Sequence, residues 1–428
     1  MSVESGATVF RGVHVFDGRN PALAGPSDVA VRGATIESVR PAGAAPVAAD
    51  ARVIEGGGQV LMPGLIDAHW HTTFAAVSVD VALSADPGYV HLVAGREAER
   101  TLLRGFTSVR DAGGPSFALK RAVDEGVVAG PRIYPSGAFI TQTAGHGDFR
   151  PRHEVPRNPC GHLSYGEVIG AATIADGVDQ VLRAVREQLM LGASQIKVMA
   201  GGGVSSPYDP IDVTQYTEAE MHAAVEAAEN WGTYVTVHAY TPRAISQALR
   251  AGVRCIEHGH LIDDATALLL AEAGAWWSLQ PFLDDDDAIP IPDPPTRVKQ
   301  LEVTAGTDRA YALARKHDIK VAWGTDTLFD ASLATRQGKQ LAKMTRWYTP
   351  ADVLTAATSG NAELLALCGP RNPYPGRLGV VEPGALADLL LVDGDPIANI
   401  DLLADPNRSL VVIMKDGRLH KDATQPHE

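Results

Sequence analysis

Eight short runs of β-forming residues, most of them separated by stretches with helical periodicity, follow one another through the middle of this 428-residue chain. Strands that alternate with helices pair in parallel, and eight such units over about 300 residues indicate an α/β fold of the TIM (β/α)8 barrel type. The helical stretches include 179–191, 218–231 and 242–251. The expected strands lie in 63–71, 106–111, 132–137, 195–199, 234–238, 254–258, 276–280 and 320–326.

Short strands with turn signals also occupy both ends of the chain. Examples are Thr35–Val39 near the start and Leu410–Met414 near the end. The first group is a small β unit that needs a partner, and the second group can supply it, because chain ends often lie close together. We therefore expect one small β-sandwich domain made from residues 1–62 and 375–428. The barrel, residues 63–374, would be inserted into it.

The composition limits the partners and the compartment. The chain is 45% hydrophobic, enough for a large core, and its net charge of −14 argues against nucleic acids and anionic membranes as partners. Three widely spaced cysteines, Cys160, Cys255 and Cys368, suit a reducing compartment and form no Cys-x-x-Cys metal cluster. The first residues lack the pattern of a signal peptide, and no apolar run approaches the ~18 residues of a membrane span. We therefore expect a cytoplasmic protein.

The stretch Pro63–His71 carries two histidines on a strand that follows a Pro-Gly turn. Side chains on a strand alternate between its faces, so His69 and His71 point the same way and Trp70 points the other way. Two imidazoles side by side on one face are able to bind one metal ion. On this motif alone, a chance pair of histidines on a partly polar strand remains the alternative.

Polar residues also lie at the C-terminal ends of four other expected strands: Lys197, His238, His258 and Asp326. Strand alternation places each of them on the inward face; Lys197, for example, alternates with Ile196 and Val198, which would face the helices. A lysine buried beside histidines has a steep desolvation cost unless its amine is modified or binds metal. Any one of these residues would pass as an ordinary core or rim residue. With His69 and His71 they make a set of six at one barrel mouth.

Several motifs along the chain resemble those of the amidohydrolase superfamily, in its imidazolonepropionase-like and prolidase-like branch. The resemblance covers nearly the whole chain, and the combination of motifs is highly specific. The motifs are Pro-Gly-Leu-Ile-Asp-x-His-x-His at 63–71, Ile-Lys-Val at 196–198, Val-His-Ala at 237–239, Ile-Glu-His-Gly at 256–259, Gly-Thr-Asp at 324–326 and Gly-x-x-Ala-Asp-Leu at 384–389.

This resemblance implies a site for two divalent ions, usually Zn²⁺, with Mn²⁺ or Co²⁺ as alternatives, bridged by a carboxylated lysine and a hydroxide. Some relatives in this branch work with a single ion. Carried over residue by residue, one ion would be held by His69, His71, Lys197 and Asp326. The other would be held by Lys197, His238 and His258.

The resemblance also implies roles in catalysis. Metal would activate a water molecule and polarise the scissile carbonyl, while Asp326 would accept the proton of that water and pass it to the leaving amine. His146 lies in a stretch like the Gly-His-Gly of this branch and would donate to the carbonyl or to the oxyanion; a loop histidine without a role is the alternative. Tyr240 would bind a substrate carboxylate or polarise the carbonyl, and Arg150 is a weaker candidate for carboxylate capture. We interpret the following as structural or surface residues: His91, His153, His162, His222, His260 and His317.

Two connections are unusually long, at 141–176 and 281–304, and both would lie on the C-terminal face of the barrel, where barrel active sites are built. The second contains four consecutive aspartates, 284–287. We interpret this acidic run as a solvated loop in preference to a direct substrate contact.

The favoured function is hydrolysis of an amide bond in a small molecule. Dipeptides and N-acyl amino acids are recurrent substrates in this branch, and some relatives cleave xenobiotic amides such as ochratoxin or phenylureas. Cyclic amide hydrolysis, as in imidazolonepropionase, and ester or carbamate hydrolysis are the alternatives. A non-catalytic interaction protein on the same fold would lack the six ligands found here. The resemblance also implies a homo-oligomer, with an octamer among the options.

Overall fold

A computed structural model describes residues 6–44, 49–155 and 161–424 of the chain. Residues 1–5, on which the absence of a signal peptide was argued, lie outside these ranges, as does Cys160. Within them, no helix is long and apolar enough to cross a membrane.

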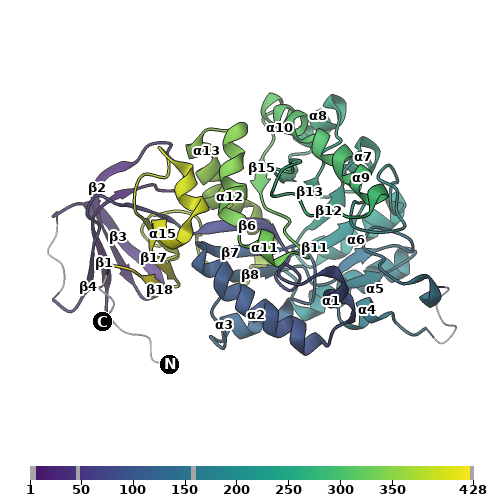
Figure 1. Ribbon diagram of the computed structural model, residues 1–428, viewed down its shortest axis with the longest axis horizontal. Helices are drawn as coiled ribbons and strands as arrows, with labels where there is room; N and C mark the ends of the chain where they lie inside the picture. Colours follow the sequence, from purple (N-terminus) through teal and green to yellow (C-terminus); the bar gives the residue numbers. More distant parts are fainter. Residues whose placement is uncertain (1–5, 45–48, 156–160, 425–428) are drawn as a thin grey trace.

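All eight strands expected for the barrel are present, and neighbouring strands pair in parallel. They belong to an α/β fold of the TIM-barrel type, seen on the right of Figure 1. Three of them form one sheet in the order β6-β7-β8, and five form a run in a seven-stranded sheet, β11-β12-β13-β14-β15. Their bounds are β6 Leu65–Trp70, β7 Phe106–Asp111, β8 Arg132–Pro135, β11 Ile196–Met199, β12 Val235–Ala239, β13 Cys255–His258, β14 Trp276–Leu279 and β15 Val321–Trp323.

Hydrogen bonds connect the two sheets at both junctions. On one side the backbone N–H of Ser194, just before β11, donates to the carbonyl of Pro135 in β8 over 2.8 Å. On the other side the Asn361 amide donates to the carbonyls of Ile66 in β6 and Trp323 in β15, over 2.7 and 2.8 Å. The C-terminal ends of all eight strands are therefore brought to one side of the molecule.

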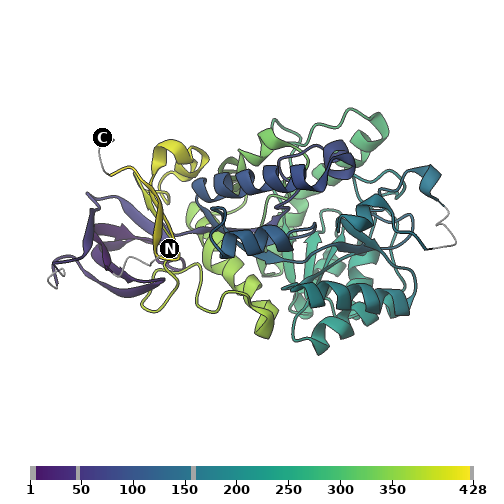
Figure 2. The same ribbon diagram turned by 90° about the horizontal axis from the view of Figure 1, so that it is seen from below.

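Amphipathic helices cover the strands, as the sequence predicts (Figures 1 and 2). The stretches predicted at 179–191, 218–231 and 242–251 are confirmed as α5, α6 and α7 to within a residue at each end. Thr217 caps helix α6, which begins at Glu218, and forms a reciprocal capping box with Glu220. The longer helices are α2 Pro87–Leu103, α3 Phe117–Asp124, α5 Val178–Leu191, α6 Glu218–Asn230, α7 Pro242–Arg250, α8 Asp264–Glu272, α9 Pro294–Ala305 and α10 Thr307–Lys316. The shorter ones are α1 Val79–Ser84, α4 Tyr165–Val168, α11 Ala331–Ala334, α12 Gln337–Ala342, α13 Pro350–Thr355, α14 Asn361–Leu365 and α15 Pro406–Ser409.

Both ends of the chain contribute to one further sheet, which Figure 1 shows in purple and yellow. Its path is β18-β17-β16-β5-β1-β2-β3, and β4 pairs with β1. The two chain ends meet where β5 and β16 pair antiparallel, with Met62 opposite Leu390. Strand β1 has an irregularity at Gly12, which takes a positive φ of 66° where the register with β2 shifts. The strands are β1 Thr8–Val15, β2 Ala24–Arg32, β3 Thr35–Pro41, β4 Arg52–Glu55, β5 Val60–Pro63, β16 Leu389–Val392, β17 Leu410–Lys415 and β18 Arg418–Asp422.

The two long connections are more ordered than the sequence suggested. A strand just before the first, β9 Phe139–Thr141, pairs with β11, and β10 Ala172–Ile174 inside the connection pairs with β9. The second connection ends earlier than predicted, since α9 begins at Pro294. Asp293 caps this helix by accepting from the N–H of Thr296, and proline suits the first helical position.

Arg132, at the start of β8, joins the barrel strands to the sheet formed by the chain ends. Its guanidinium donates to both carboxylate oxygens of Asp388, over 2.9 and 3.2 Å, and also to Asp416. The side chains of Arg132 and Asp388 are almost fully buried. Loss of one partner leaves the other charge buried and uncompensated.

We therefore expect Arg132→Ala to destabilise the protein strongly, by about 3–5 kcal/mol, because it leaves the buried Asp388 carboxylate without its counter-charge. Urea denaturation followed by circular dichroism measures this as a lower midpoint. The matched control is Arg121→Ala on α3, whose exposed pair with Glu125 contributes little. Equal midpoints for the two variants would contradict the assigned role of Arg132.

Candidate metal centre and active-site cavity

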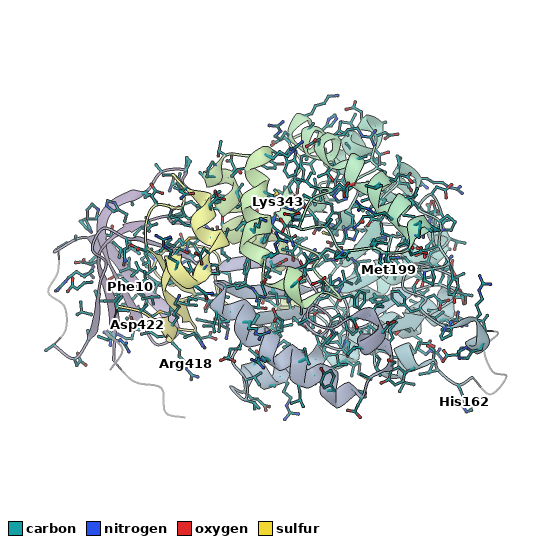
Figure 3. The ribbon with its side chains drawn as sticks, in the orientation of Figure 1. Phe10, His162, Met199, Lys343, Arg418 and Asp422 are labelled. Carbon is teal, nitrogen blue, oxygen red and sulfur yellow. The ribbon has the colours of Figure 1, made fainter. Side chains whose placement is uncertain are left out.

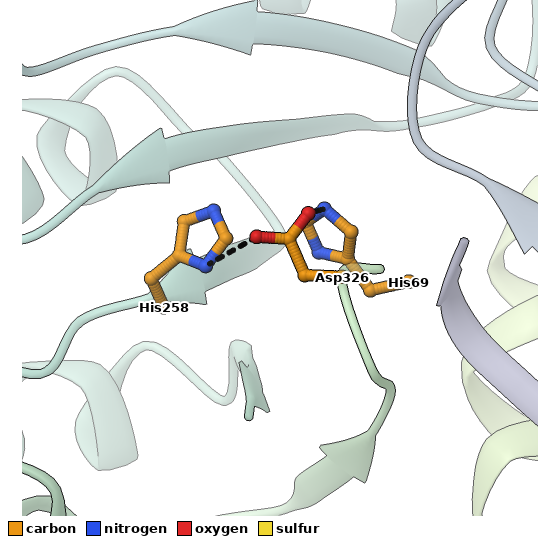
Figure 4. Close-up of side chains that lie close together, drawn as sticks. All are labelled: His69, His258 and Asp326. Carbon is orange, nitrogen blue, oxygen red and sulfur yellow. Dashed lines mark ion pairs between the residues drawn. The ribbon is translucent and has the colours of Figure 1, made fainter. Parts of the chain in front are cut away.

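Three of the residues predicted as metal ligands, His69, His71 and Asp326, lie together where β6 and β15 end. The Nε2 atoms of His69 and His71 lie 3.1 and 3.2 Å from Asp326 Oδ1. His258 comes from the end of β13, and its Nδ1 lies 3.9 Å from Asp326 Oδ2 (Figure 4). One oxygen or nitrogen from each of His69, His258 and Asp326 can be chosen so that all lie within 4.8 Å of one another.

Both imidazoles from the His-x-His motif are fixed through their Nδ1 atoms. His69 Nδ1 lies 2.7 Å from Glu257 Oε2, and His71 Nδ1 lies 2.9 Å from the carbonyl oxygen of Gly113. Since carboxylates and carbonyls only accept, each Nδ1 carries the proton. In both rings Nε2 is therefore the nitrogen available to a metal ion.

The other two histidines are fixed in the same way by different acceptors. His238 Nε2 donates to the carbonyl of Gly202 over 3.0 Å, which leaves Nδ1 available. His258 Nδ1 lies 2.8 Å from the amide oxygen of Gln280, which leaves Nε2 available. All four imidazoles are thus oriented by a neighbour and each offers one nitrogen, the arrangement typical of histidine ligands in metal sites.

The distances among the candidate ligand atoms fit a metal ion. Around tetrahedral zinc with bonds of about 2.0–2.1 Å, ligand atoms lie roughly 3.3 Å apart. The separations of 3.1 and 3.2 Å between Asp326 Oδ1 and the two Nε2 atoms agree with this. The nitrogen, oxygen and amine donors present suit zinc and its first-row neighbours.

Lys197 lies on β11 with only 2% of its surface exposed, and it lines the same cavity as the four histidines. Among the residues that the structure describes, none forms a hydrogen bond or ion pair with its amine. Burial lowers the pKa of this amine, although Glu257 and Asp326 oppose the shift. An unpartnered buried amine is costly, so its surroundings favour a modified or metal-bound form.

A buried ion pair lies behind the histidines. Arg110 and Glu257 are both fully buried, and their closest atoms are 2.6 Å apart. Burial alone would raise the pKa of Glu257, but Arg110, His69 and Lys197 hold that pKa well below its usual range. Glu257 is therefore held as a carboxylate and accepts from His69 Nδ1.

Two of the candidate ligands have left-handed backbone conformations. The φ angles are 71° at His258 and 53° at Asp326, an uncommon region for residues other than glycine. This explains how the neighbours Glu257 and His258 both reach the centre, which strand alternation alone does not allow. Asp326 lies beyond the end of β15, so the alternation argument does not apply to it either. Such strained backbone tends to cluster at functional sites.

Gly324 lets the backbone of β6 approach the Asp326 segment. A Cβ atom on Gly324 would lie 2.4 Å from the backbone nitrogen of His69, closer than atoms can pack. The backbone N–H of Asp326 donates to the carbonyl of His69 over 2.8 Å at the same contact. The Gly-Thr-Asp motif is thus needed for space as well as for its carboxylate.

The histidines lie on the floor of a cavity of about 400 Å³. Figure 3 labels Met199 and Lys343, which both line it, well apart from Phe10 in the sheet of the chain ends. The walls come from the segments that follow the C-terminal ends of the strands, including α1 and β9, and are mainly apolar. They include Phe74, Val79, Leu83, Phe139, Phe149, Val204, Ile289, Pro290, Ile291, Leu328 and Phe329.

The acidic run is not uniformly solvated, which corrects our interpretation of it. Asp284, Asp285 and Asp286 are exposed, but the side chain of Asp287 is only 3% exposed. Asp287 pairs with Arg336 at 2.6 Å and with Lys343 at 2.5 Å. These pairs hold the apolar wall segment 288–292 against the region around α12.

The structure also places the residues predicted to contact substrate. His146 and Tyr240 line the cavity; their rings lie 4.1 and 4.8 Å from the ring of His238. Burial raises the pKa of Tyr240, so its hydroxyl stays protonated and able to donate. Arg150 is not among the residues lining this cavity, and both its Nε and Nη2 donate to Asp148, at 2.8 and 2.6 Å. The six histidines interpreted as structural or surface residues do not line it either.

Comparison with known proteins agrees with this site. Residues 60–419 match the amidohydrolase family. The chain belongs to that family. It is 31% identical to the ochratoxinase of Aspergillus niger over 382 residues, which is 85% of this chain and 76% of that protein. A crystal structure of a prolidase complexed with N-methylphosphonate-L-proline is 36% identical, with a TM-score of 0.88, covering 97% of this chain and 100% of that one. A Xaa-Pro dipeptidase with bound methionine is 27% identical, with a TM-score of 0.83 and the same coverage.

This amidohydrolase therefore falls in the prolidase and ochratoxinase branch that its motifs predicted, and it is a hydrolase. Sequence reasoning missed Arg110, Glu257 and Gln280, which support the candidate ligands from behind. Glu257 stands inside the quoted Ile-Glu-His-Gly motif, so its place beside His258 was the available signal. No motif marks Arg110, the last residue but one of β7, or Gln280, which directly follows β14.

Gln280→Leu is expected to weaken metal binding by about 10–100-fold, because His258 Nδ1 loses its acceptor and the ring is free to turn. Titration of the metal-free protein with Zn²⁺ against a competing chelator measures the change. Gln180→Leu, at an exposed position, serves as the matched control. An unchanged zinc affinity in folded Gln280→Leu would contradict this support of His258.

Proposed function

We propose that this protein is a metal-dependent hydrolase of amide bonds in small molecules. The observation that carries the proposal is the fixing of four imidazoles around Asp326 and Lys197, each through one nitrogen, so that its other nitrogen is left for a metal ion. Its substrates would be dipeptides or N-acyl amino acids, or a xenobiotic amide such as ochratoxin. The ochratoxinase and dipeptidase relatives support this class. Cyclic amide, ester and carbamate hydrolysis remain the alternatives.

His69, His71, Lys197 and Asp326 would hold one divalent ion, and Lys197, His238 and His258 a second. Lys197 would bridge them as a carbamate. Zn²⁺ is the first candidate, and Mn²⁺ or Co²⁺ the alternatives. Bound there, such ions polarise a carbonyl and lower the pKa of water toward ~7.

The protein's own groups would then move the proton. Asp326 lies against His69 and His71, so its carboxylate has a fixed position at the cavity floor. From there it would accept a proton from the attacking water and pass it to the leaving nitrogen. His146 and Tyr240, on the cavity wall, would donate hydrogen bonds to the carbonyl oxygen as negative charge develops on it.

The cavity favours a substrate with a bulky apolar group. The cavity walls are mainly apolar. Two lysines, Lys197 and Lys343, are among the residues that line the cavity. Lys343 is paired with Asp285 and Asp287, at 2.7 and 2.5 Å, so its charge is already balanced. A substrate carboxylate would therefore depend on Tyr240 or on the metal centre.

Four features of the wider molecule belong to the same proposal. The eight strands would close into a full barrel of residues 63–374, and the sheet of the chain ends would form a two-layer domain from 1–62 and 375–428. The protein would assemble as a homo-oligomer and act in the cytoplasm. Sedimentation that found only a 45.2 kDa monomer would count against assembly.

Removal of metal is expected to abolish hydrolysis, because water activation and carbonyl polarisation both depend on it. The assay would follow a panel of dipeptides, N-benzoyl amino acids and neutral anilides before chelation, after chelation, and after return of Zn²⁺, Mn²⁺ or Co²⁺. Elemental analysis of the restored protein would distinguish one bound ion from two. Full turnover in demonstrably metal-free protein would refute the proposal.

Asp326→Asn is expected to reduce kcat by about 10²–10⁴-fold even at saturating metal, since asparagine cannot relay a proton. The measurement is kcat on the best substrate of the panel, together with bound metal. Asp286→Asn, in the exposed part of the acidic run, is the control and should leave kcat unchanged. If metal-loaded Asp326→Asn kept a kcat near that of the wild type, Asp326 would not be the group that transfers the proton.

A further inference from the structure

The segment Gly201–Asp209 follows β11 at the cavity rim; its Gly202 carbonyl accepts from His238, and its Val204 forms part of the cavity wall. The segment lies against His146, and Lys299 from helix α9 binds it. The amine of Lys299, on α9, donates to the carbonyls of Gly203, Ser206 and Asp209 over 3.2, 3.3 and 2.7 Å. The segment is therefore held in one place relative to the cavity.

One edge of the His146 ring packs into this segment. Its Nδ1 contacts the hydroxyl of Ser206 and lies 3.3 Å from Asp209 Oδ2. A Cβ atom on Gly203 would lie 2.0 Å from both Nδ1 and Cε1 of the ring, so only glycine leaves room there. The face of the ring stacks on His238, with 4.1 Å between centroids.

Asp209 has an unusual environment for a carboxylate. It is 1% exposed, and its Oδ2 accepts from the backbone N–H of Gly203 over 2.6 Å. Its Oδ1 is buried without a hydrogen-bond partner. Lys299 binds the backbone carbonyl of Asp209 and not its carboxylate, so among the described residues the His146 ring is its one ion-pair partner. Burying a carboxylate costs free energy unless the charge is paired, so the Asp209 carboxylate depends on the His146 ring and the Gly203 N–H.

We propose that Asp209 is a positioning residue that acts through His146. With Ser206 and Gly203 it holds the Nδ1 edge of the ring, so that Nε2, which has no partner among the described residues, faces the cavity. Nε2 is then fixed where it can meet the substrate carbonyl. This inference rests on the proposed function of His146, and it assigns a purpose to the Gly-Gly-Gly-Val-Ser-Ser-Pro-Tyr-Asp stretch at 201–209.

A double-mutant cycle tests this coupling. Asp209→Asn keeps the shape of the side chain but replaces an acceptor with an amide, and we expect kcat/KM to fall by about 10²-fold, mainly through kcat. In the His146→Ala background the same change should cost nothing further, because the residue acts through the missing ring. The probe is the most rapidly cleaved amide of the panel above. Asp212→Asn, at an exposed position in the following residues, is the matched control.

Three outcomes would overturn the proposal: unchanged kcat/KM in Asp209→Asn, an equal further loss in the His146→Ala background, or a loss explained by reduced bound metal or a lower Tm. A crystal structure of Asp209→Ala gives a readout independent of turnover. The His146 ring should leave its contact with Gly203, and an unmoved ring would also overturn the proposal. Failure of the proposed function would show differently, as turnover that survives chelation.

Discussion

The buried ion pair between Arg110 and Glu257 fixes His69, the first ligand of the candidate centre along the chain. Taking two charges out of water costs several kcal/mol per ion, and only good geometry and further hydrogen bonds recover it. Here Arg110 also donates to the Ala68 carbonyl at 2.5 Å, and Glu257 accepts from Thr236 and lies against His69. Because Glu257 stays ionised, His69 keeps its proton on Nδ1 and turns Nε2 toward Asp326. The Arg110–Glu257 pair thus sets the orientation of His69 without being a candidate metal ligand itself.

The part of the fold that depends on periodicity was predictable from the sequence. Parallel strands buried on both faces show as apolar runs, and amphipathic helices such as α5 and α6 repeat their apolar positions with the helical period. All eight expected strands exist for this reason. The short strands β9 and β10 were missed because three-residue strands carry too little pattern, and α9 because its N-terminus follows a proline-rich, acidic loop that suggested irregular structure.

The candidate site was predictable only as a set of residue types. Motifs pointed to the histidines, Lys197 and Asp326, but strand alternation could not explain how His258 and Asp326 reach the centre. Their positive φ angles are a property of tertiary packing and leave no periodic trace in the sequence. The acceptors on the imidazoles come from distant segments: Glu257 lies 188 residues from His69 in the chain. No local pattern could pair them, and the same holds for Asp209 and His146.

The separation between floor and walls has a functional consequence. The imidazoles of the floor are held by groups from several strands, so the centre can form only when those strands are assembled. The walls belong to the segments between the barrel strands, many of them loops such as 288–292, which is held by the ion pairs of Asp287. Loops vary at little cost to the strands that carry them, since they add few contacts to the core. Changes in these walls can therefore alter which amide is accepted while leaving the arrangement of the ligands intact. This physical division is compatible with one fold serving relatives as different as a prolidase and an ochratoxinase.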